Sequence, residues 1–502
     1  MRGSRWLAAA IVVLAAGVVS GRGQEPPSLL IRNAMVVDGT GAPGRQADVR
    51  IAGAKIVEVG RLTPASAERM IDVGGLTLAP GFIDTHSHHD RGLSERPDVL
   101  AAVSQGITTI VVGQDGGSSF PLATFFDSLR ASPVALNVAS YVGHGTIRRR
   151  VLGDDYRRAA TDEELAKMRE LLRAEMQAGA FGLSTGLEYD PGIYSKPEEV
   201  IALAKDVAAM GGRYMSHIRS EDRHFWKAID EVITIGREAK LPVHVSHVKL
   251  AMRNLWGQSA KLLQAMDRAR KDGVQLTADI YPYTYWQSGA TVLFPERNYD
   301  DEAEAELVLK EVVAPADLLF TSFPTNPAYA GRTLAQIAAE RGTKPAPTLL
   351  ALIKENEAAG TSASVVATSM DEKDVGELMK WPFANICSDG AMGGGHPRGF
   401  GAFPRVLGIY VRERGVLKLE DAIRKMTVLA AANAGIKDRG RIAAGQFADL
   451  VLFDPRSVVD RATTAAPQAQ SEGIKTVWVN GVEVFRDGAA TGARPGQVLR
   501  AR

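Results

Sequence analysis

One pattern repeats from residue 76 to about residue 429: a short apolar, β-rich run, then a loop, then a stretch with helical periodicity. Strands that alternate with helices indicate a parallel sheet covered by helices. There are eight β-rich runs, at residues 76–83, 108–112, 135–142, 180–184, 213–217, 242–246, 275–280 and 384–387. The pattern therefore predicts an α/β fold with a (β/α)8 barrel at residues 76–435, in which functional side chains follow the C-terminal ends of the strands.

The connection between the seventh and eighth runs is too long for a simple loop. We expect an insertion at about residues 285–380 that contains helices of its own. Because it leaves the barrel at the C-terminal end of a strand, it is expected to cover the functional site.

The two ends of the chain share a pattern that differs from the strand–loop–helix pattern of the middle. Residues 29–73 hold short β-rich runs broken by glycines, and similar runs return at 449–453 and 476–485, where Asn480-Gly481 indicates a hairpin turn. The sequence therefore predicts a small β-sandwich domain built from both ends, residues 24–75 and 436–502.

Residues 1–23 are typical of a signal peptide: Arg2 and Arg5, an apolar stretch at 6–19, and small residues before Gln24. The stretch is too short for a membrane helix, and no cysteine follows it for lipid attachment. We expect a cleaved leader and an exported protein, periplasmic or secreted. No later segment is apolar and long enough to span a membrane.

The charge balance limits the kinds of binding partner, and the cysteine content limits the disulfides that the chain can form. The chain has 59 Lys and Arg against 58 Asp and Glu, and loss of the leader with its three arginines leaves the balance slightly acidic. This composition does not indicate nucleic acid as a partner. The single cysteine, Cys387, excludes an internal disulfide.

Three histidines end the first β-rich run. Residues two apart on an extended chain point to the same side, so His86 and His88 can face one ion together, whereas the adjacent His89 faces away and is expected to be structural. An isolated His-x-His pair is about as often solvated at the surface as it is bound to a metal. Whether this pair binds a metal therefore depends on the rest of the chain.

Further ionisable residues follow the other predicted strands. These are Asp115, His144, Glu188, His217, His247 and Asp389 after strands two, three, four, five, six and eight. Each alone is most often a hydrogen-bonded structural residue. Their convergence at one rim would be costly to bury unless they held cations, and imidazole with carboxylate suits zinc.

Motifs around these residues are similar to those of the D-aminoacylase (N-acyl-D-amino-acid deacylase) branch of the amidohydrolase superfamily. They include His86-Ser87-His88, Val142-Gly143-His144-Gly145-Thr146, Ser216-His217-Ile218-Arg219, Ser246-His247-Val248-Lys249, Asp279-Ile280-Tyr281-Pro282-Tyr283, Ser388-Asp389-Gly390 and His396-Pro397-Arg398. The resemblance covers nearly the whole chain after the leader and implies the same barrel and sandwich.

The resemblance also implies roles. His86, His88, His217 and His247 would hold one or two zinc ions that activate water, and Asp389 would move the proton from that water to the leaving nitrogen. Lys249 and Tyr283, with Arg398, would hold the substrate carboxylate. Arg219 and His144 stand in the same motifs and are further substrate-binding candidates.

One position departs from the family. D-aminoacylases place a cysteine ligand after strand two, where this chain has Asp115. Other members of the superfamily bridge two metals with a carboxylated lysine or glutamate near the position of Glu188. We expect Glu188 to bridge and Asp115 to act as an outer-shell or substrate contact, with the reverse as the alternative.

The sequence thus indicates an exported, zinc-dependent amidohydrolase that cleaves N-acyl amino acids, in particular N-acyl-D-amino acids. A dipeptidase for D-residues, a cyclic-amide hydrolase of the dihydropyrimidinase or dihydroorotase kind, and an inactive scaffold are the alternatives. The expected partner is a small N-acyl amino acid or dipeptide, and an oligomer is compatible with the sequence.

Overall fold

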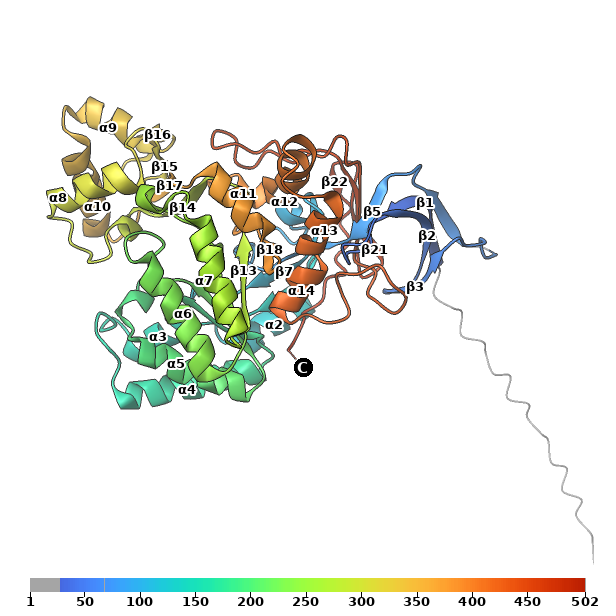
Figure 1. Ribbon diagram of the computed structural model, residues 1–502, viewed down its shortest axis with the longest axis horizontal. Coiled ribbons are helices and arrows are strands. Elements are labelled where there is room, and N and C mark those ends of the chain that lie inside the picture. The colour runs from blue at the N-terminus through green and yellow to red at the C-terminus, as the bar shows by residue number, and fades with distance from the viewer. Residues whose placement is uncertain (1–27, 67, 502) are drawn as a thin grey trace, which may run out of the picture.

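The computed structural model describes residues 28–66 and 68–501. The predicted leader, residues 1–23, lies outside the described residues. Figure 1 shows three parts: a barrel region in the middle, a β-sheet domain on the right and an inserted domain at the upper left.

The barrel is confirmed, with its strands in sequence order. They are β6 (Phe82–Asp84), β7 (Ile107–Val112), β8 (Asn137–Ser140), β9 (Val142–Gly143), β10 (Gly182–Gly186), β11 (Arg213–His217), β12 (Val243–Val245), β13 (Leu276–Ile280) and β18 (Ala384–Ile386). Parallel pairing forms two arcs, β6-β7-β8 and β9-β10-β11-β12-β13-β18. The arcs meet through the chain at Tyr141 and through the parallel bridge between Ser87 and Gly390.

Helices pack around this barrel. They are α1 (Leu100–Val103), α2 (Leu122–Ala131), α3 (His144–Leu152), α4 (Asp162–Gln177), α5 (Pro197–Ala209), α6 (Phe225–Ala239), α7 (Ser259–Lys271), α11 (Glu372–Lys380), α12 (Arg398–Arg405), α13 (Leu419–Met426) and α14 (Val428–Ala434). Their buried faces are apolar, as in α6, where Ile229, Val232 and Ile233 are buried. Most of the barrel strands and helices share one large apolar core, and a smaller cluster joins strand residues such as Ile83 and Val111 to α14.

The sheet domain combines both ends of the described chain. Its strands are β1 (Ser28–Val36), β2 (Arg45–Ala52), β3 (Lys55–Gly60), β4 (Arg69–Asp72), β5 (Thr77–Pro80), β19 (Leu450–Phe453), β20 (Ile474–Val479), β21 (Val482–Arg486) and β22 (Ala489–Ala490). Hydrogen bonds join them into one nine-stranded sheet in which β5 lies between β1 and β19. The run expected at 76–83 is thus divided at Gly81, where the chain passes from this sheet into the barrel.

The inserted domain follows β13. It consists of β14 (Tyr285–Gly289), α8 (Glu302–Leu307), β15 (Leu318–Ser322), β16 (Arg332–Thr333), α9 (Leu334–Arg341), α10 (Pro345–Ala358) and β17 (Ser364–Thr368). Its strands form a separate sheet in the order β14-β17-β15-β16.

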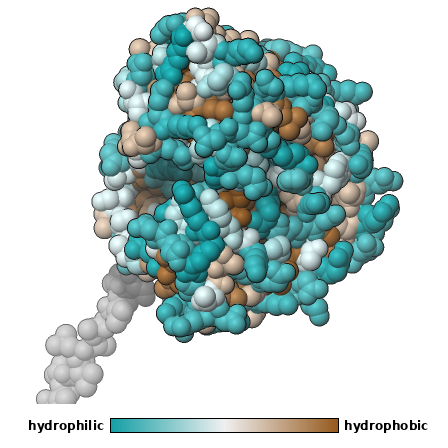
Figure 2. Space-filling model, turned by 90° about the vertical axis from the view of Figure 1, so that its left-hand side faces the viewer, coloured by the Kyte–Doolittle hydropathy of each residue, from teal (hydrophilic) through white to brown (hydrophobic). Residues whose placement is uncertain are grey.

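The surface in Figure 2 is mostly hydrophilic, with apolar residues scattered among polar ones. Within residues 28–66 and 68–501, the helices are too short or too polar to cross a bilayer.

A buried polar network joins the barrel to the sheet domain. Arg439 forms an ion pair with Asp449, and both side chains are 2% exposed. The Asp449 carboxylate also accepts hydrogen bonds from the backbone N–H of Asn480 at 2.7 Å and from the side chain of Asn137, on β8, at 3.2 Å. Removal of one charge would leave the other buried without its partner.

We therefore expect Arg439→Met to lower the free energy of unfolding by about 3–5 kcal/mol, because Asp449 would remain as an uncompensated buried charge. Urea denaturation of purified protein measures this. Arg456→Met, which breaks an exposed pair with Asp454, is the control and should leave the midpoint unchanged. Equal midpoints for both variants would contradict a stabilising role for the network.

Candidate metal and active site

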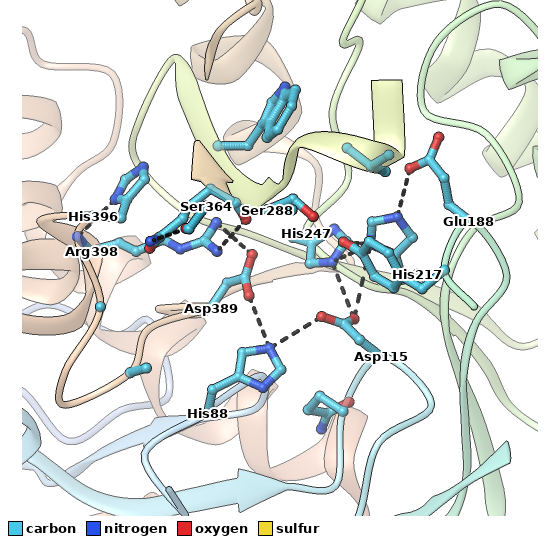
Figure 3. Close-up of a pocket in the computed structure, with 18 of the residues that line it drawn as sticks. His88, Asp115, Glu188, His217, His247, Ser288, Ser364, Asp389, His396 and Arg398 are labelled. Atoms are coloured by element: carbon cyan, nitrogen blue, oxygen red, sulfur yellow. Dashed lines mark hydrogen bonds and ion pairs between the residues drawn. The ribbon is translucent and has the colours of Figure 1, made fainter. Parts of the chain in front are cut away.

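Six ionisable side chains meet at the C-terminal ends of the barrel strands. Figure 3 labels His88, Asp115, His217, His247 and Asp389 among them. They are His86 and His88 after β6, Asp115 after β7, His217 at the end of β11, His247 after β12, and Asp389 after β18. Of the strand-end residues named from the sequence, these six therefore converge on one side of the barrel, whereas His144 and Glu188 lie outside the cluster around Asp115.

Asp115 lies at the centre of this cluster. Its Oδ2 is 3.1 Å from His88 Nε2, and its Oδ1 is 3.3 Å from His86 Nε2 and 3.4 Å from His247 Nε2. The Nδ1 atom of His217 is 4.0 Å from the same Oδ1. One carboxylate thus faces four imidazoles.

A left-handed turn delivers Asp115 to this position. Its φ is +53°, and the flanking Gly113 and Gly116 have φ of +76° and +74°. A Cβ on Gly113 would stand 2.2 Å from the carbonyl oxygen of Tyr141, so this position admits only glycine. His247 and Asp389 also have positive φ, +35° and +50°, and such strained residues concentrate at functional sites.

Asp389 faces the cluster from β18. It is 3.3 Å from His88 Nε2 and 3.5 Å from His86 Nε2, and Arg398 Nη1 lies 2.6 Å from its other oxygen. Burial alone would raise its pKa, but the positive charges of Arg398 and the histidines outweigh this and hold the pKa of Asp389 well below its usual range. The carboxylate is therefore ionised at neutral pH.

The carboxylates around the cluster favour positive charge on its histidines. Burial lowers the pKa of His88, yet hydrogen bonds with Asp115 and Asp389 outweigh it and raise the pKa to about 9. His247 behaves likewise: burial and Lys249 lower its pKa, while Glu221, Asp389 and Asp115 raise it to about 10.

Buried atoms without hydrogen-bond partners also indicate that the cluster binds a cation. Among the residues that the structure describes, neither ring nitrogen of His86 has a hydrogen-bond partner, and Oδ1 of Asp115 has none either, although all three atoms are buried. Unsatisfied buried polar atoms are costly, and imidazole nitrogens with carboxylate oxygens are the ligands that zinc prefers. The site thus fits one or two divalent cations between the histidines and Asp115.

Glu188 stands behind this cluster. Its Oε2 is 2.8 Å from Nε2 of His217, the nitrogen that points away from Asp115, and Figure 3 shows it beyond His217. A carboxylate on the outer nitrogen commonly orients a metal-ligating histidine. These distances favour the alternative, with Asp115 facing the ion, while the bridge expected at Glu188 stays a prediction, since Glu188, His217 and Glu221 also form a group that could hold an ion.

Glu221 makes the equivalent contact with His247 and was not found from the sequence. Its Oε1 is 3.1 Å from His247 Nδ1 and accepts a hydrogen bond from Lys249 Nζ at 2.5 Å. It lies four residues after His217, away from the end of any strand, so strand-end position gave no signal for it.

The predicted carboxylate-binding group is only partly assembled at the site. Lys249 and Arg398 line the cavity, but Tyr283 does not; it packs between Arg405, 4.8 Å from its ring, and His396. Tyr281 does not line the cavity either, although its ring centre lies 5.6 Å from Lys249 Nζ and 4.9 Å from the Arg398 guanidinium. Among the described residues, the buried hydroxyls of both tyrosines lack a hydrogen-bond partner.

Arg219 and His144 are also outside the cavity. Arg219 donates two hydrogen bonds of 2.8 Å to Glu231, and His144 Nε2 is 2.8 Å from Glu199. Direct substrate contact is therefore not supported for either residue. His89 is buried with Nε2 3.1 Å from the carbonyl of Gly399, a structural contact.

The cluster forms the floor of a cavity of about 670 Å³. The inserted domain supplies the opposite wall with Trp286, Gln287, Ser288, Val292, Leu293, Val312 and Ser364. Among the described residues that line the cavity, those of the insertion include no charged side chain. Arg91 and Arg96 are exposed at the mouth.

The amidohydrolase family model matches residues 69–348 and 388–485. The chain is 38% identical to a D-aminoacylase of Alcaligenes xylosoxydans xylosoxydans over 95% of this chain and 98% of the relative. It is 39% identical to an N-acyl-D-aspartate deacylase of the same organism, over 94% of each chain.

A solved structure is also similar. It is an N-acyl-D-glutamate deacylase from Bordetella bronchiseptica in complex with zinc and a phosphonate inhibitor that mimics the tetrahedral intermediate. It has a TM-score of 0.85 and 36% identity over 95% of this chain and 100% of that chain.

The geometry makes opposite predictions for Asp115 and Glu188. We expect Asp115→Asn to lose bound divalent metal, because it removes the charge that faces all four histidines. Glu188→Gln should retain metal stoichiometry after the same dialysis and lose at most about 10- to 100-fold in affinity, as outer-shell changes do. Elemental analysis of both proteins measures this; a stripped Glu188→Gln beside a loaded Asp115→Asn would contradict the assignment.

Proposed function

This chain belongs to the amidohydrolase family, in the branch of the D-aminoacylases and N-acyl-D-amino-acid deacylases, and we propose that it hydrolyses N-acyl-D-amino acids in a zinc-dependent reaction. The observation that carries the proposal is the Asp115 cluster at the floor of a cavity that also holds Asp389, Lys249 and Arg398. Water adds across the amide: the acyl carbon gains a hydroxyl, the C–N bond breaks, and the nitrogen gains the proton.

The metal would be held by His86, His88, His217, His247 and Asp115, as one or two zinc ions. When bound, zinc lowers the pKa of a coordinated water and polarises a carbonyl. Glu188 and Glu221 hold the outer nitrogens of His217 and His247, which fixes the orientation of both rings.

Asp389 is the proposed general base and acid. It is ionised because Arg398 and the histidines lower its pKa, so it can accept the proton of the attacking water. Its contacts with His86 and His88 place it over the cluster, and the same carboxyl can then release the proton to the leaving nitrogen.

Lys249 and Arg398 are proposed to bind the carboxylate of the substrate. Lys249 is held by Glu221, and Arg398 Nη1 contacts Asp389, so both cations are fixed in direction. The ring centre of Tyr281 lies 5.6 Å from Lys249 Nζ and 4.9 Å from the Arg398 guanidinium, so its phenol is a further candidate for this carboxylate beside Tyr283.

The uncharged wall of the inserted domain indicates which amino-acid side chains the cavity accepts. Trp286, Val292, Leu293 and Val312 offer apolar surface, and the polar groups beside them are neutral, such as Ser288 and Ser364. A buried carboxylate would find no cation on this wall. We therefore propose that neutral, apolar D-amino acids are preferred over D-aspartate and D-glutamate.

Export remains a proposal from the leader-like composition of residues 1–23. A periplasmic or secreted deacylase would act on N-acylated or peptide-linked D-amino acids outside the cytoplasm. Cell fractionation of the producing organism tests this location.

We expect Asp389→Asn to retain metal and lose turnover, because the amide keeps the shape of the side chain without its basicity. General acid–base groups contribute about 10²- to 10⁴-fold, and the loss of kcat on N-acetyl-D-leucine should lie at or beyond this range. Asp272→Asn, an exposed change at the end of α7, is the control. Near-normal kcat in Asp389→Asn would overturn its role.

Lys249→Ala should raise KM for N-acetyl-D-leucine by roughly 10- to 100-fold, the range for a lost charged hydrogen bond, and should affect N-acetyl-D-leucinamide much less. Steady-state kinetics on the acid and the amide measure the difference. Lys271→Ala, at the end of α7, is the matched control. Equal changes for acid and amide would remove Lys249 from the carboxylate site.

A further inference from the structure

A second cavity adjoins the active-site cavity on the side of α3. It is an open groove of about 650 Å³, and three residues, Asp115, Gly117 and Tyr189, line both it and the active-site cavity. Tyr189 stands at the junction, with its hydroxyl 3.2 Å from Nδ1 of His217. The groove and the active-site cavity therefore share the wall formed by these three residues, beside the candidate metal ligands.

Arg149 and Arg150 line this groove from α3. The Arg149 guanidinium lies over the ring of Tyr156 at 4.2 Å, and that of Arg150 lies over Phe120 at 4.9 Å. Within the described chain, neither has a carboxylate within 4.0 Å. Aromatic stacking orients a guanidinium and leaves its N–H donors free for a ligand.

The neighbouring arginines of the same segment are different. Arg148 is fully buried and pairs with Glu199, and Arg158 pairs with Asp155 at 2.6 Å and Glu164 at 2.7 Å. The segment thus has carboxylates at hand, yet the two arginines that face the groove have none.

The groove also contains Asp190, whose charge is already compensated. Asp190 accepts hydrogen bonds from Arg297 at 3.0 Å and from the Tyr156 hydroxyl at 3.1 Å. Asp115 faces the histidine cluster. The free charge of the groove is therefore the positive charge of Arg149 and Arg150.

The position of the groove indicates which half of the substrate enters it. Arg398 and His396 lie on one side of Asp389, and His217 and Glu188 lie on the opposite side (Figure 3). Tyr189 and the groove adjoin His217, away from Arg398. If the substrate carboxylate is held at Arg398, the acyl half extends past Tyr189 toward Arg149 and Arg150.

We propose that this groove is an acyl subsite for acyl groups that end in a carboxylate, such as succinyl or glutaryl. The inference rests on the proposed deacylase function and adds the class of acyl group. The two guanidiniums are exposed, so solvent weakens their attraction for the carboxylate, and the effect on kcat/KM is expected to be several-fold.

The test compares N-succinyl-D-leucine with N-succinamoyl-D-leucine, which has the same shape with a neutral amide at the end. For the metal-loaded enzyme, kcat/KM should be about 3- to 30-fold higher for the succinyl compound at low salt, and the ratio should fall in 0.5 M sodium chloride, where screening is stronger. The double variant Arg149→Gln/Arg150→Gln should bring the ratio to about one with the succinamoyl rate unchanged.

Two further variants test whether the preference depends on the charges of Arg149 and Arg150. Arg157→Gln removes an exposed arginine of the same segment that does not line the groove, and it should keep the wild-type ratio. Arg149→Lys/Arg150→Lys keeps the charges and should keep most of the preference. A wild-type ratio of one or less, or a ratio that the double glutamine variant does not change, would overturn the subsite alone. Failure to hydrolyse N-acetyl-D-leucine and both succinyl-type compounds would overturn the deacylase function with it.

Discussion

The site depends on one buried carboxylate, Asp115, facing four imidazoles. Its oxygens lie 3.1 to 3.4 Å from nitrogens of His86, His88 and His247, and 4.0 Å from His217. Such a concentration of buried polar groups is costly unless each charge is compensated. A bound cation would satisfy Asp115 and the histidines together, which explains why atoms of both are left without hydrogen-bond partners by the protein itself.

A second layer of carboxylates holds this arrangement in place. Glu188 and Glu221 contact the outer nitrogens of His217 and His247, so the other nitrogens of the two rings, which lie 3.0 Å from each other, face Asp115. Glu221 also accepts a hydrogen bond from Lys249. One carboxylate therefore orients a candidate metal ligand and the cation proposed to bind the substrate, so a shift of either residue is transmitted to the other.

The sequence predicted the barrel and most of the cluster because strand periodicity fixes which residues follow each strand. Position after a strand does not fix side-chain direction. Asp115 turns inward because its backbone is left-handed between two glycines, while Glu188, also just past a strand, lies on the outer side of His217. The expectation that Glu188 bridges rested on its position after the fourth predicted strand, and that position does not tell which way the carboxylate points.

Tyr281 and Tyr283 illustrate the same limit. Residues two apart share a face only while the chain stays extended. Here the N–H of Tyr283 donates to the carbonyl of Tyr281 at 3.1 Å, a tight turn that sends the two rings to different surroundings. Arg219 and His144, predicted to bind substrate, show a further limit, because a charged residue in a motif near the site can pair with a structural partner, here Glu231 and Glu199.

The three surfaces around the substrate come from different parts of the fold, and this separation has a consequence for specificity. The metal-facing residues and Asp389 belong to the barrel strands, whose pairing and strained turns leave little freedom. The side-chain wall belongs to the inserted domain, and the acyl groove is lined in part by α3. Changes on either of these surfaces can alter which substrate fits without moving the atoms of the floor. In the proposed reaction, the uncharged wall and the two arginines would select opposite kinds of group at the two ends of the same amide, a neutral side chain at one end and an anionic acyl chain at the other.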